Sequence, residues 1–331
     1  MKRFVDLADF TRDEVLALLE LARRLERQPE PHALAGKLLG LVFFNPSLRT
    51  LASFQAAMAR LGGHSLVINP GQGSWQMETR AGVVMDGAAA EHVREGIPVL
   101  ASYCDALGIR VFAEGRDLAS DLAETTFSAM ASLTDKPLVN LESAVNHPCQ
   151  ALADWKTLDD LAVPRAGRFV LSWAYHPRAL PLAVPAAALH MAALRGMEVI
   201  VLRPEGFALP QAIMERARRA AAAAGGSVRE TSERAEALSG AEVLYVKEWG
   251  ATSCYGDTAG DARLRSALTD WCVRGDWFGA AAQCRVMHCL PVRRNTAIAD
   301  EVLDSARSVV QRQAYNRLPA QMAVLHQLLR S

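Results

Sequence analysis

Between an apolar run and an amphipathic run, the chain reads Phe43-Phe44-Asn45-Pro46-Ser47-Leu48-Arg49-Thr50. The apolar run, residues 38–44, is short and predicts a buried strand. The amphipathic run, residues 51–61, has apolar residues at helical spacing and ends at two glycines. Because Ser47 is a favourable N-cap, the junction predicts a strand, a tight turn and the start of a helix.

This junction has the features of an anion-binding site. The start of a helix presents backbone N–H groups that have no partner within the helix, and these can bind an anion. Arg49 adds a positive charge, and the hydroxyls of Ser47 and Thr50 add donors. The Gly-x-x-x-x-Gly-Lys of a nucleotide-binding loop is absent. An ordinary capped helix with a surface arginine would look alike, so this segment alone leaves both interpretations open.

Two further motifs follow predicted strands elsewhere in the chain. His147-Pro148-Cys149-Gln150 comes after a predicted strand over residues 137–141, and His288-Cys289-Leu290-Pro291 comes after one over residues 284–287. Together with Ser47-Leu48-Arg49-Thr50, and in this order, they resemble the signatures Ser-x-Arg-Thr, His-Pro-x-Gln and His-Cys-Leu-Pro of the aspartate/ornithine carbamoyltransferase family. The resemblance runs nearly from end to end.

Strand and helix patterns alternate along the chain, which predicts an α/β protein with two doubly wound parallel-sheet domains. Helices are expected over residues 11–27 with Thr11 as cap, from near Ala151, and over residues 210–224 and 319–329. The strands are predicted over residues 38–44, 64–68, 106–112, 137–141, 168–173, 197–202, 242–246 and 284–287.

The resemblance also implies what each domain does. Residues 1–148 would bind carbamoyl phosphate, residues 149–315 would bind an acylated ornithine, and a terminal helix over about residues 316–331 would pack back on the first domain. Ligands of doubly wound folds gather at the carboxyl ends of the strands. An active-site cleft between the two domains is therefore expected.

Composition agrees with a cytoplasmic enzyme of two domains. The chain has 331 residues, half of them hydrophobic, and a formal net charge of zero. It has no run of basic residues, so neither a nucleic acid nor a membrane is expected as a partner. Its six cysteines lack disulfide or metal spacing and are expected to be reduced thiols. Asp6 and Asp9 interrupt what would be the apolar core of a signal peptide.

The residues at the predicted strand ends suit transfer of a carbamoyl group. An amine attacks the carbonyl of carbamoyl phosphate and phosphate leaves, which requires phosphate binding, oxyanion stabilisation and placement of the amine. Arg49 suits the phosphate because a guanidinium binds it bidentately. Arg110 and His147 are predicted to polarise the carbonyl, and Gln150 to accept from the carbamoyl NH2 group. These three are the catalytic candidates, and no metal, cofactor or covalent nucleophile is required.

The resemblance implies the same roles and adds further contacts. The residues it assigns to carbamoyl phosphate are Ser47, Leu48, Arg49, Thr50, Trp75, Arg110, His147, Gln150, Cys289, Leu290 and Arg317. The residues it assigns to the acylated ornithine are Glu142, His176, Lys247 and Arg293, with Ala90 at the position that distinguishes acyl groups. In the family, the loop that carries Trp75 reaches a neighbouring subunit's site, so a homotrimer with shared active sites is expected.

Segments such as Trp75-Gln76-Met77-Glu78-Thr79 and Met85-Asp86-Gly87 resemble the branch of the family that acts on N-succinylornithine or N-acetylornithine, so an Nα-acylated ornithine is the expected amine. Ornithine carbamoyltransferases carry Asp-x-x-x-Ser-Met-Gly where this chain reads Val246-Lys247-Glu248-Trp249-Gly250-Ala251. Acetyl-specific enzymes have a glutamate at the position of Ala90, and succinyl-specific enzymes have a proline there. A glutamate would repel the carboxylate of a succinyl group, so its absence favours N-succinylornithine, with N-acetylornithine as the alternative.

Two departures from the family pattern keep another interpretation open. Leu51 stands where many members have a second arginine, and Tyr315 replaces the acidic residue before Asn-Arg. An ornithine carbamoyltransferase or a catalytically silent paralogue is the further alternative. An oxidoreductase would share the architecture, but no Gly-x-Gly-x-x-Gly follows a predicted strand. A zinc site around Cys284 and His288 lacks a second ligand cluster.

Overall fold

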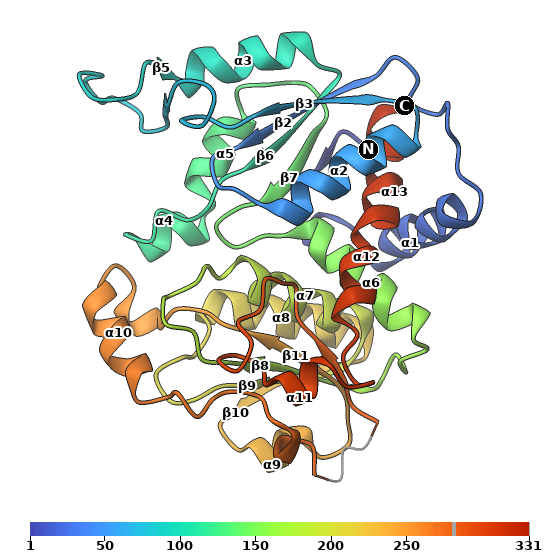
Figure 1. Cartoon of the computed structure of the whole chain (residues 1–331), viewed down its shortest axis with the longest axis vertical. Coiled ribbons are helices and arrows are strands. Elements are labelled where there is room, and N and C mark those ends of the chain that lie inside the picture. The colour runs from blue at the N-terminus through green and yellow to red at the C-terminus, as the bar shows by residue number, and fades with distance from the viewer. Residues whose placement is uncertain (280–282, 331) are drawn as a thin grey trace. The chain divides into compact units, whose positions relative to one another are not determined.

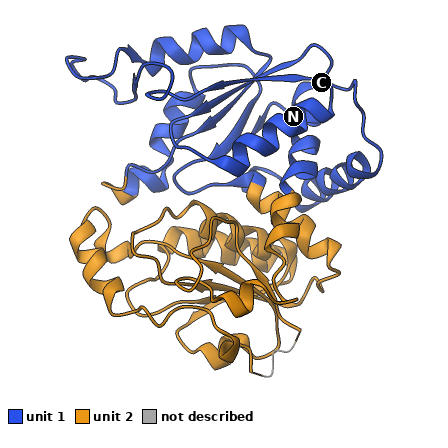
Figure 2. Ribbon diagram, viewed as in Figure 1, with its two compact units in different colours: residues 1–114, 119–149, 317–331 blue, residues 115–118, 150–316 orange. Residues whose placement is uncertain are grey.

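A five-stranded parallel sheet forms the centre of the first of two units into which the chain divides (Figure 2). The computed structural model describes residues 1–279 and 283–330. The first unit comprises residues 1–114, residues 119–149 and the segment from Arg317, and the second comprises residues 115–118 and 150–316. Apart from the short excursion at residues 115–118, the chain therefore leaves the first unit after Cys149 and returns to it at Arg317.

The strands of the first unit lie in the order β1-β7-β6-β2-β3, and all of them run parallel. They are β1 (Arg3–Phe4), β2 (Leu38–Phe43), β3 (His64–Ile68), β6 (Ala106–Arg110) and β7 (Leu138–Glu142). A separate pair consists of β4 (Met77–Glu78) and β5 (Glu91–His92). The helices are α1 (Arg12–Arg27), α2 (Leu48–Arg60), α3 (Val93–Tyr103), α4 (Leu118–Leu122), α5 (Thr125–Ala131) and α13 (Arg317–Leu329), with a 3-10 turn at Leu7–Asp9.

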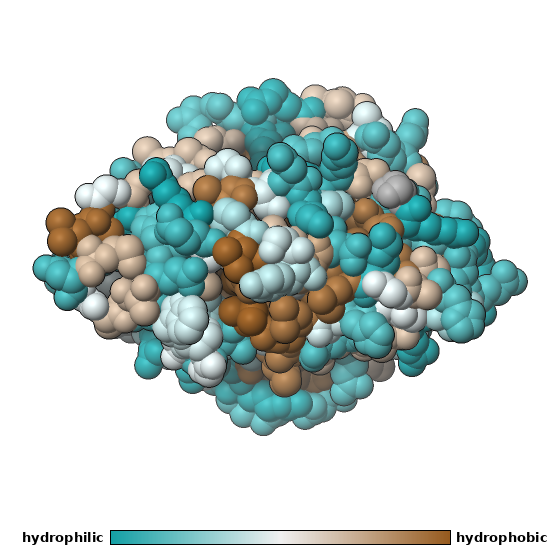
Figure 3. Space-filling model, turned by 90° about the horizontal axis from the view of Figure 1, so that it is seen from above, coloured by the Kyte–Doolittle hydropathy of each residue, from teal (hydrophilic) through white to brown (hydrophobic). Residues whose placement is uncertain are grey.

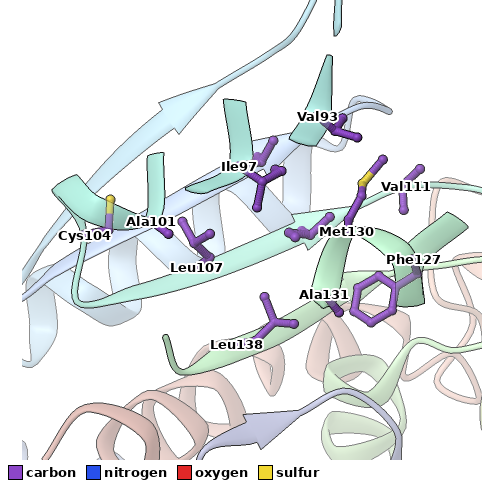
Figure 4. Packing of buried hydrophobic residues seen from close by; sticks show 12 residues of the cluster. Val93, Ile97, Ala101, Cys104, Leu107, Val111, Phe127, Met130, Ala131 and Leu138 are labelled. Atoms are coloured by element: carbon purple, nitrogen blue, oxygen red, sulfur yellow. The ribbon is translucent and has the colours of Figure 1, made fainter. Parts of the chain in front are cut away.

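The helices of this unit pack through apolar faces. The C-terminal helix α13 packs against α1 and α2, which come from the start of the chain (Figure 1). Helices α3 and α5 supply side chains that point toward those of β6 and β7 (Figure 4). Full burial of each large aliphatic side chain contributes about 1.5–3 kcal/mol, so this cluster holds both helices against the sheet. The buried cluster consists of Val42, Val93, Ile97, Ala101, Cys104, Leu107, Ile109, Val111, Phe127, Met130, Ala131 and Leu138.

The second unit repeats the architecture with a sheet in the order β10-β9-β8-β11-β12, again parallel throughout. Its strands are β8 (Arg168–Trp173), β9 (Glu198–Leu202), β10 (Ser227–Thr231), β11 (Ala241–Lys247) and β12 (Arg285–Met287). Its helices are α7 (Ala183–Arg195), α8 (Gln211–Ala224), α9 (Arg234–Leu238), α10 (Thr258–Ser266), α11 (Asp300–Leu303) and α12 (Val310–Tyr315), with 3-10 turns at Thr252–Cys254 and Gly275–Trp277. Helix α6 (Pro148–Asp160) begins in the first unit and continues in the second.

The predicted α/β class with parallel sheets is confirmed, and every predicted strand is present with small shifts at its ends. The capping box at Thr11 and the cap at Ser47 are also present. The predicted start of the helix near Ala151 was wrong, because α6 begins at Pro148. Proline fits the first helical position, since its fixed φ is helical and its missing N–H would have no partner there.

Four strands escaped the sequence analysis, namely β1, β4, β5 and β10. The strands β1, β4 and β5 are each only two residues long, which is too short for a periodic pattern. β10 reads Ser-Val-Arg-Glu-Thr and lies at the edge of its sheet. Edge strands commonly carry charged side chains that discourage pairing with another chain, so β10 lacks the apolar run of the central strands.

Candidate active site

The carboxyl ends of three neighbouring strands bring predicted site residues together in the first unit. Phe43 at the end of β2 is paired with Arg110 at the end of β6, and Arg110 is paired with Glu142 at the end of β7. Because the strands are parallel, the segments that follow them start at the same edge of the sheet. The segment after β2 carries the Ser47 cap, and the segment after β7 leads to His147.

Arg110 is held by four contacts. Its Nε donates to the carbonyl oxygen of Asn45 at 3.1 Å, and its guanidinium forms a buried ion pair with Glu142. A further nitrogen lies 3.5 Å from the carbonyl oxygen of Pro46, and the guanidinium carbon lies 4.5 Å from the centroid of the Phe112 ring. The arginine is only 6% exposed. Its charge is therefore fixed in direction before any substrate binds.

His147 lies beside the same carboxylate. Its Nε2 is 3.4 Å from Glu142 Oε2, and the ring is buried. Burial, and then the charges of Arg317, Arg110 and Arg49, lower the pKa of His147 well below its usual range. The imidazole is therefore neutral at about pH 7, and it can act as a neutral hydrogen-bonding group.

The N-terminus of α2 completes the cluster. Ser47 Oγ accepts from the Thr50 N–H at 3.3 Å, and the Thr50 hydroxyl accepts from Arg317 of α13 at 3.0 Å. Burial lowers the pKa of Arg317, and the neighbouring charges of Arg110 and Arg49 lower it further. Three guanidinium groups thus converge on one helix N-terminus. Like charges repel, so such an arrangement favours an anion that carries more than one charge.

The lowered pKa of His147 predicts a pH dependence of stability. The unfolded chain binds a proton at this histidine below about pH 6.5, whereas the folded chain does not until a lower pH. The free energy of unfolding therefore falls as the pH drops from about 6.5 toward the folded-state pKa, by up to about 1.4 kcal/mol per pH unit. Urea unfolding at about pH 7.5 and pH 5.5 should show a larger loss in the wild type than in His147→Gln, in which His176, whose pKa burial also lowers, still contributes.

The exposed His64 offers the matched control for that measurement. His64→Gln should retain the pH dependence of the wild type, because removal of an exposed imidazole does not remove the buried one. An equal loss of stability on acidification in the wild type and in His147→Gln would contradict the assignment.

Trp75 and Ala90 belong to the segment around β4 and β5. The indole Nε1 of Trp75 donates to Glu91 at 2.6 Å, and the Ala90 N–H donates to the carbonyl oxygen of Gln76 at 3.1 Å. Trp75 is 60% exposed, and Ala90 is also exposed. The side chains of the cluster around Arg110 are, by contrast, mostly buried. The structure therefore presents Trp75 on a surface segment.

The second unit gathers its predicted residues at the carboxyl edge of its own sheet. Trp173 of β8 is paired with Lys247 of β11, so the segment carrying His176 starts beside Lys247. Arg293 Nε donates to His176 Nε2 at 2.9 Å. Nδ1 lies 2.8 Å from the carbonyl oxygen of Arg178. Burial lowers the pKa of His176 despite this contact.

Gln150 is oriented by a buried carboxylate that the sequence analysis missed. Its Nε2 donates to Asp154 at 2.8 Å, and this places the amide oxygen as the acceptor end of Gln150. Asp154 also accepts from Gln313 at 2.8 Å and from the Tyr245 hydroxyl at 2.9 Å. The spacing could have indicated the contact between Gln150 and Asp154, because residues four apart in a helix share one face. The contact was missed because a helix that starts near Ala151 would leave Gln150 outside it.

The segment after β12 carries the last predicted contacts. Cys289 is partly buried, and Leu290 has a φ of 58°, in the left-handed region that leucine rarely adopts. The N–H of His288 donates to Gln313 Oε1 at 2.9 Å. The network of Asp154 and Gln313 therefore connects Gln150 with the 288–290 segment.

The described part of the chain has neither a metal-binding cluster nor a membrane-spanning helix. No three or more His, Cys, Asp or Glu side chains among residues 1–279 and 283–330 are grouped so that they could hold a metal ion. No helix in the described part of the chain has both the length and the apolar character needed to cross a membrane.

Comparison with known proteins matches both halves of the chain to one family. Residues 2–160 match the carbamoyl phosphate-binding domain of aspartate/ornithine carbamoyltransferases, and residues 184–328 match their aspartate/ornithine-binding domain. The chain is 35% identical to the N-acetylornithine carbamoyltransferase of Xanthomonas campestris pv. campestris, over 99% of this chain and 98% of that protein. It is also 35% identical to the N-succinylornithine carbamoyltransferase of Bacteroides thetaiotaomicron, over 88% of this chain and 87% of that protein.

A solved structure extends the likeness to three dimensions. A variant of N-acetyl-L-ornithine transcarbamylase with one glutamate changed to alanine, in complex with carbamyl phosphate and N-succinyl-L-norvaline, matches with a TM-score of 0.93. It shares 35% identity, and the match covers 99% of this chain and 100% of that one. The motifs, the two parallel sheets and these matches agree. The chain belongs to the aspartate/ornithine carbamoyltransferase family.

Proposed function

We propose that this protein transfers the carbamoyl group of carbamoyl phosphate to the δ-amine of an Nα-acylated ornithine, with N-succinylornithine favoured over N-acetylornithine. The products are the N-acylated citrulline and phosphate. The observation that carries the proposal is the convergence of Arg49, Arg110 and Arg317 on the N-terminus of α2 beside a neutral His147. This arrangement suits a phosphate dianion attached to a carbonyl group.

The first substrate would be bound through its two ends. Arg49, Arg317 and the donors at Ser47 to Thr50 would bind the phosphate, with the N–H of the exposed Leu48 among them. Arg110 and His147 would stabilise the negative charge that develops on the carbonyl oxygen. The amine forms a bond to the carbonyl carbon, the bond to the phosphate oxygen breaks, and the phosphate leaves with the electron pair and takes up the proton that the amine nitrogen loses.

The roles of Gln150 and of the 289–290 backbone concern the carbamoyl NH2 group. Gln150 offers its amide oxygen as an acceptor because its Nε2 is already bonded to Asp154. The backbone of Cys289 and Leu290 would supply the remaining contacts. Such fixed placement of the reacting group is a large contribution to catalysis in reactions that use no covalent intermediate.

The second substrate carries carboxylates and an amide. Lys247 and Arg293 would bind the carboxylates, while Glu142 and His176 would contact the amide and amine groups. The succinyl preference is supported by the solved variant in which one glutamate is changed to alanine, because that protein was crystallised with a succinylated amino acid. By the family resemblance, Ala90 occupies the position of the glutamate that acetyl-specific enzymes carry.

Assays with carbamoyl phosphate and ornithine, N-acetylornithine or N-succinylornithine in parallel test the function. Formation of N-succinylcitrulline with the highest kcat/KM supports the proposal in full. A higher kcat/KM with N-acetylornithine supports carbamoyl transfer to an acylated ornithine but overturns the preference for the succinyl group. Turnover of ornithine alone, or of none of the three, overturns the assignment to acylated ornithine.

The change Ala90→Glu should reverse the acyl preference. A new carboxylate beside the acyl group repels the succinyl carboxylate and has no like charge to repel on an acetyl group. We expect kcat/KM for N-succinylornithine to fall by roughly tenfold or more, while that for N-acetylornithine changes by less than about threefold. Ala90→Gln is the control, since it has nearly the same size and no charge. An equal effect of both variants would argue for steric exclusion instead.

The assembly proposed for this protein is a homotrimer in the cytoplasm that serves arginine biosynthesis. Apolar residues gather in patches on one face of the molecule (Figure 3), and the exposed apolar side chains include Trp75, Val84, Met85, Val99 and Tyr103. Exposed apolar patches commonly mark protein interfaces. For the trimer that the family resemblance implies, light scattering in solution should give three times the chain mass of 35.9 kDa. The mass of one chain at micromolar concentration would contradict the trimer.

A further inference from the structure

A buried group of three charged or titratable side chains lies at the carboxyl edge of the second sheet. Lys247 ends β11, Glu248 follows it, and His288 follows β12. The pairing of Tyr245 with Met287 brings the two strand ends together. Lys247 is 7% exposed, Glu248 is 1% exposed and His288 is fully buried. Buried charges are costly unless they are paired, so the contacts of Glu248 define this group.

The carboxylate of Glu248 contacts both neighbours. Its Oε2 accepts from Lys247 Nζ at 2.7 Å, and both of its oxygens lie 3.3 Å from His288 Nε2. Burial raises the pKa of Glu248, but Lys247 and His288 outweigh this effect and hold the pKa below its usual range. Glu248 is therefore ionised, and the ammonium of Lys247 has a fixed partner.

The imidazole of His288 contacts Glu248 on one side and the backbone of Leu290 on the other. Its Nδ1 accepts from the Leu290 N–H at 2.9 Å, so the proton of a neutral ring lies on Nε2, toward Glu248. Leu290 is the residue with a φ of 58°. A non-glycine residue in this region is strained and persists only when its surroundings hold it. The His288 ring is one of those restraints, and its tautomer depends on the carboxylate.

We propose that Glu248 is a positioning residue that acts on both substrates. Through His288 it fixes the backbone of Cys289 and Leu290, and through its ion pair it fixes the ammonium of Lys247. The proposal rests on the proposed function, which assigns the 289–290 backbone to carbamoyl phosphate and Lys247 to the acylated ornithine. A buried ion pair alone is weak evidence for a role in stability, because apolar residues of similar size often serve as well.

The tautomer of His288 tests whether Glu248 acts through His288 on the backbone of Leu290. This test requires no enzymatic turnover. Nitrogen-15 NMR of the wild-type protein with labelled histidine distinguishes the two ring nitrogens, and the spectrum of His288→Gln identifies the signal. We expect the neutral ring of His288 to carry its proton on Nε2, because Nδ1 accepts from the Leu290 N–H. A proton on Nδ1 would break the Leu290 contact and overturn the proposal. Failure of the proposed function, seen as no turnover of any ornithine derivative, leaves this measurement intact.

The kinetics of Glu248→Gln test whether this residue acts on the binding of both substrates. We expect the KM values for carbamoyl phosphate and for the acylated ornithine each to rise by roughly ten- to a hundredfold, because both sets of contacts lose their orientation. Glu248→Asp should recover part of the loss. Lys247→Met should raise only the KM for the acylated ornithine. An effect of Glu248→Gln on that substrate alone would overturn the link through His288.

A matched control separates positioning from stability. Asp159 is a carboxylate in the same unit, and it accepts from the buried Arg195 at 3.0 Å. Asp159→Asn should lower the melting temperature and leave both KM values unchanged. If Glu248→Gln behaves in the same way, Glu248 has only a structural role and the proposal is wrong.

A second variant covers the case in which Glu248→Gln does not fold. The single change leaves the ammonium of Lys247 buried without its partner, so we would compare the double variant Lys247→Met/Glu248→Gln with Lys247→Met. A further rise in the KM for carbamoyl phosphate in the double variant supports the action through His288. No further rise overturns it.

Discussion

Replacing Arg110 with glutamine should lower kcat by about 10²–10³-fold, the loss typical of removing one fixed donor to a developing oxyanion. The guanidinium is fixed by Glu142 and by the carbonyl oxygen of Asn45, so its charge needs no reorganisation when the carbonyl oxygen becomes negative. Glutamine is shorter and neutral, and it cannot supply that charge. Steady-state kinetics at saturating concentrations of both substrates measures the effect.

Arg195 provides a close control for this change. Like Arg110, it is buried and bonded to one carboxylate and to backbone carbonyl oxygens, those of Val163 and Pro164. Arg195→Gln should therefore reduce stability to a similar degree while kcat stays within about threefold of the wild type, because the residue has no assigned contact with substrate. A fall in kcat with Arg195→Gln as large as with Arg110→Gln would show that loss of a buried ion pair, and not loss of oxyanion stabilisation, causes the effect.

Replacing Arg49 with alanine should lower kcat/KM for carbamoyl phosphate by about 10²-fold. A hydrogen bond to a charged group contributes about 1.5–3 kcal/mol, and a bidentate contact between guanidinium and phosphate lies at the upper end. Arg49 lies in the first turn of α2, where its charge adds to that of the helix dipole. The effect should appear mainly as a higher KM for carbamoyl phosphate.

The same helix contains the control. Arg60 is the exposed residue that ends α2, so Arg60→Ala removes an arginine from the opposite end of that helix. We expect no more than about a twofold change in kcat/KM, since surface substitutions away from a site usually have small effects. Binding of inorganic phosphate, measured by calorimetry, should weaken in Arg49→Ala and remain unchanged in Arg60→Ala. Unchanged binding in Arg49→Ala would exclude the helix start as the phosphate site.

Features with local causes could be predicted from the sequence. The Ser47 and Thr11 caps depend on residues only three positions away, and both are present. The central strands are continuous apolar runs because parallel sheets are covered on both faces. The polar edge strand β10 lacks that pattern and was missed.

Contacts between residues far apart in the chain required the structure. Arg317 and Thr50 are 267 positions apart, and His288 and Glu248 are 40 positions apart. No spacing rule links such pairs, because the order of strands in each sheet brings them together. The roles of Asp154 and Glu248 follow from those contacts and not from any motif.

Local features and long-range contacts differ in predictability for a physical reason. Local propensity, capping and apolar periodicity act over a few residues, and they sufficed for the α/β class, the positions of the apolar strands and the three motifs. Strand order, register and burial arise when the whole chain packs. They alone place Arg110, Glu142 and His147 side by side, leave His147 neutral and surround Glu248 with Lys247 and His288.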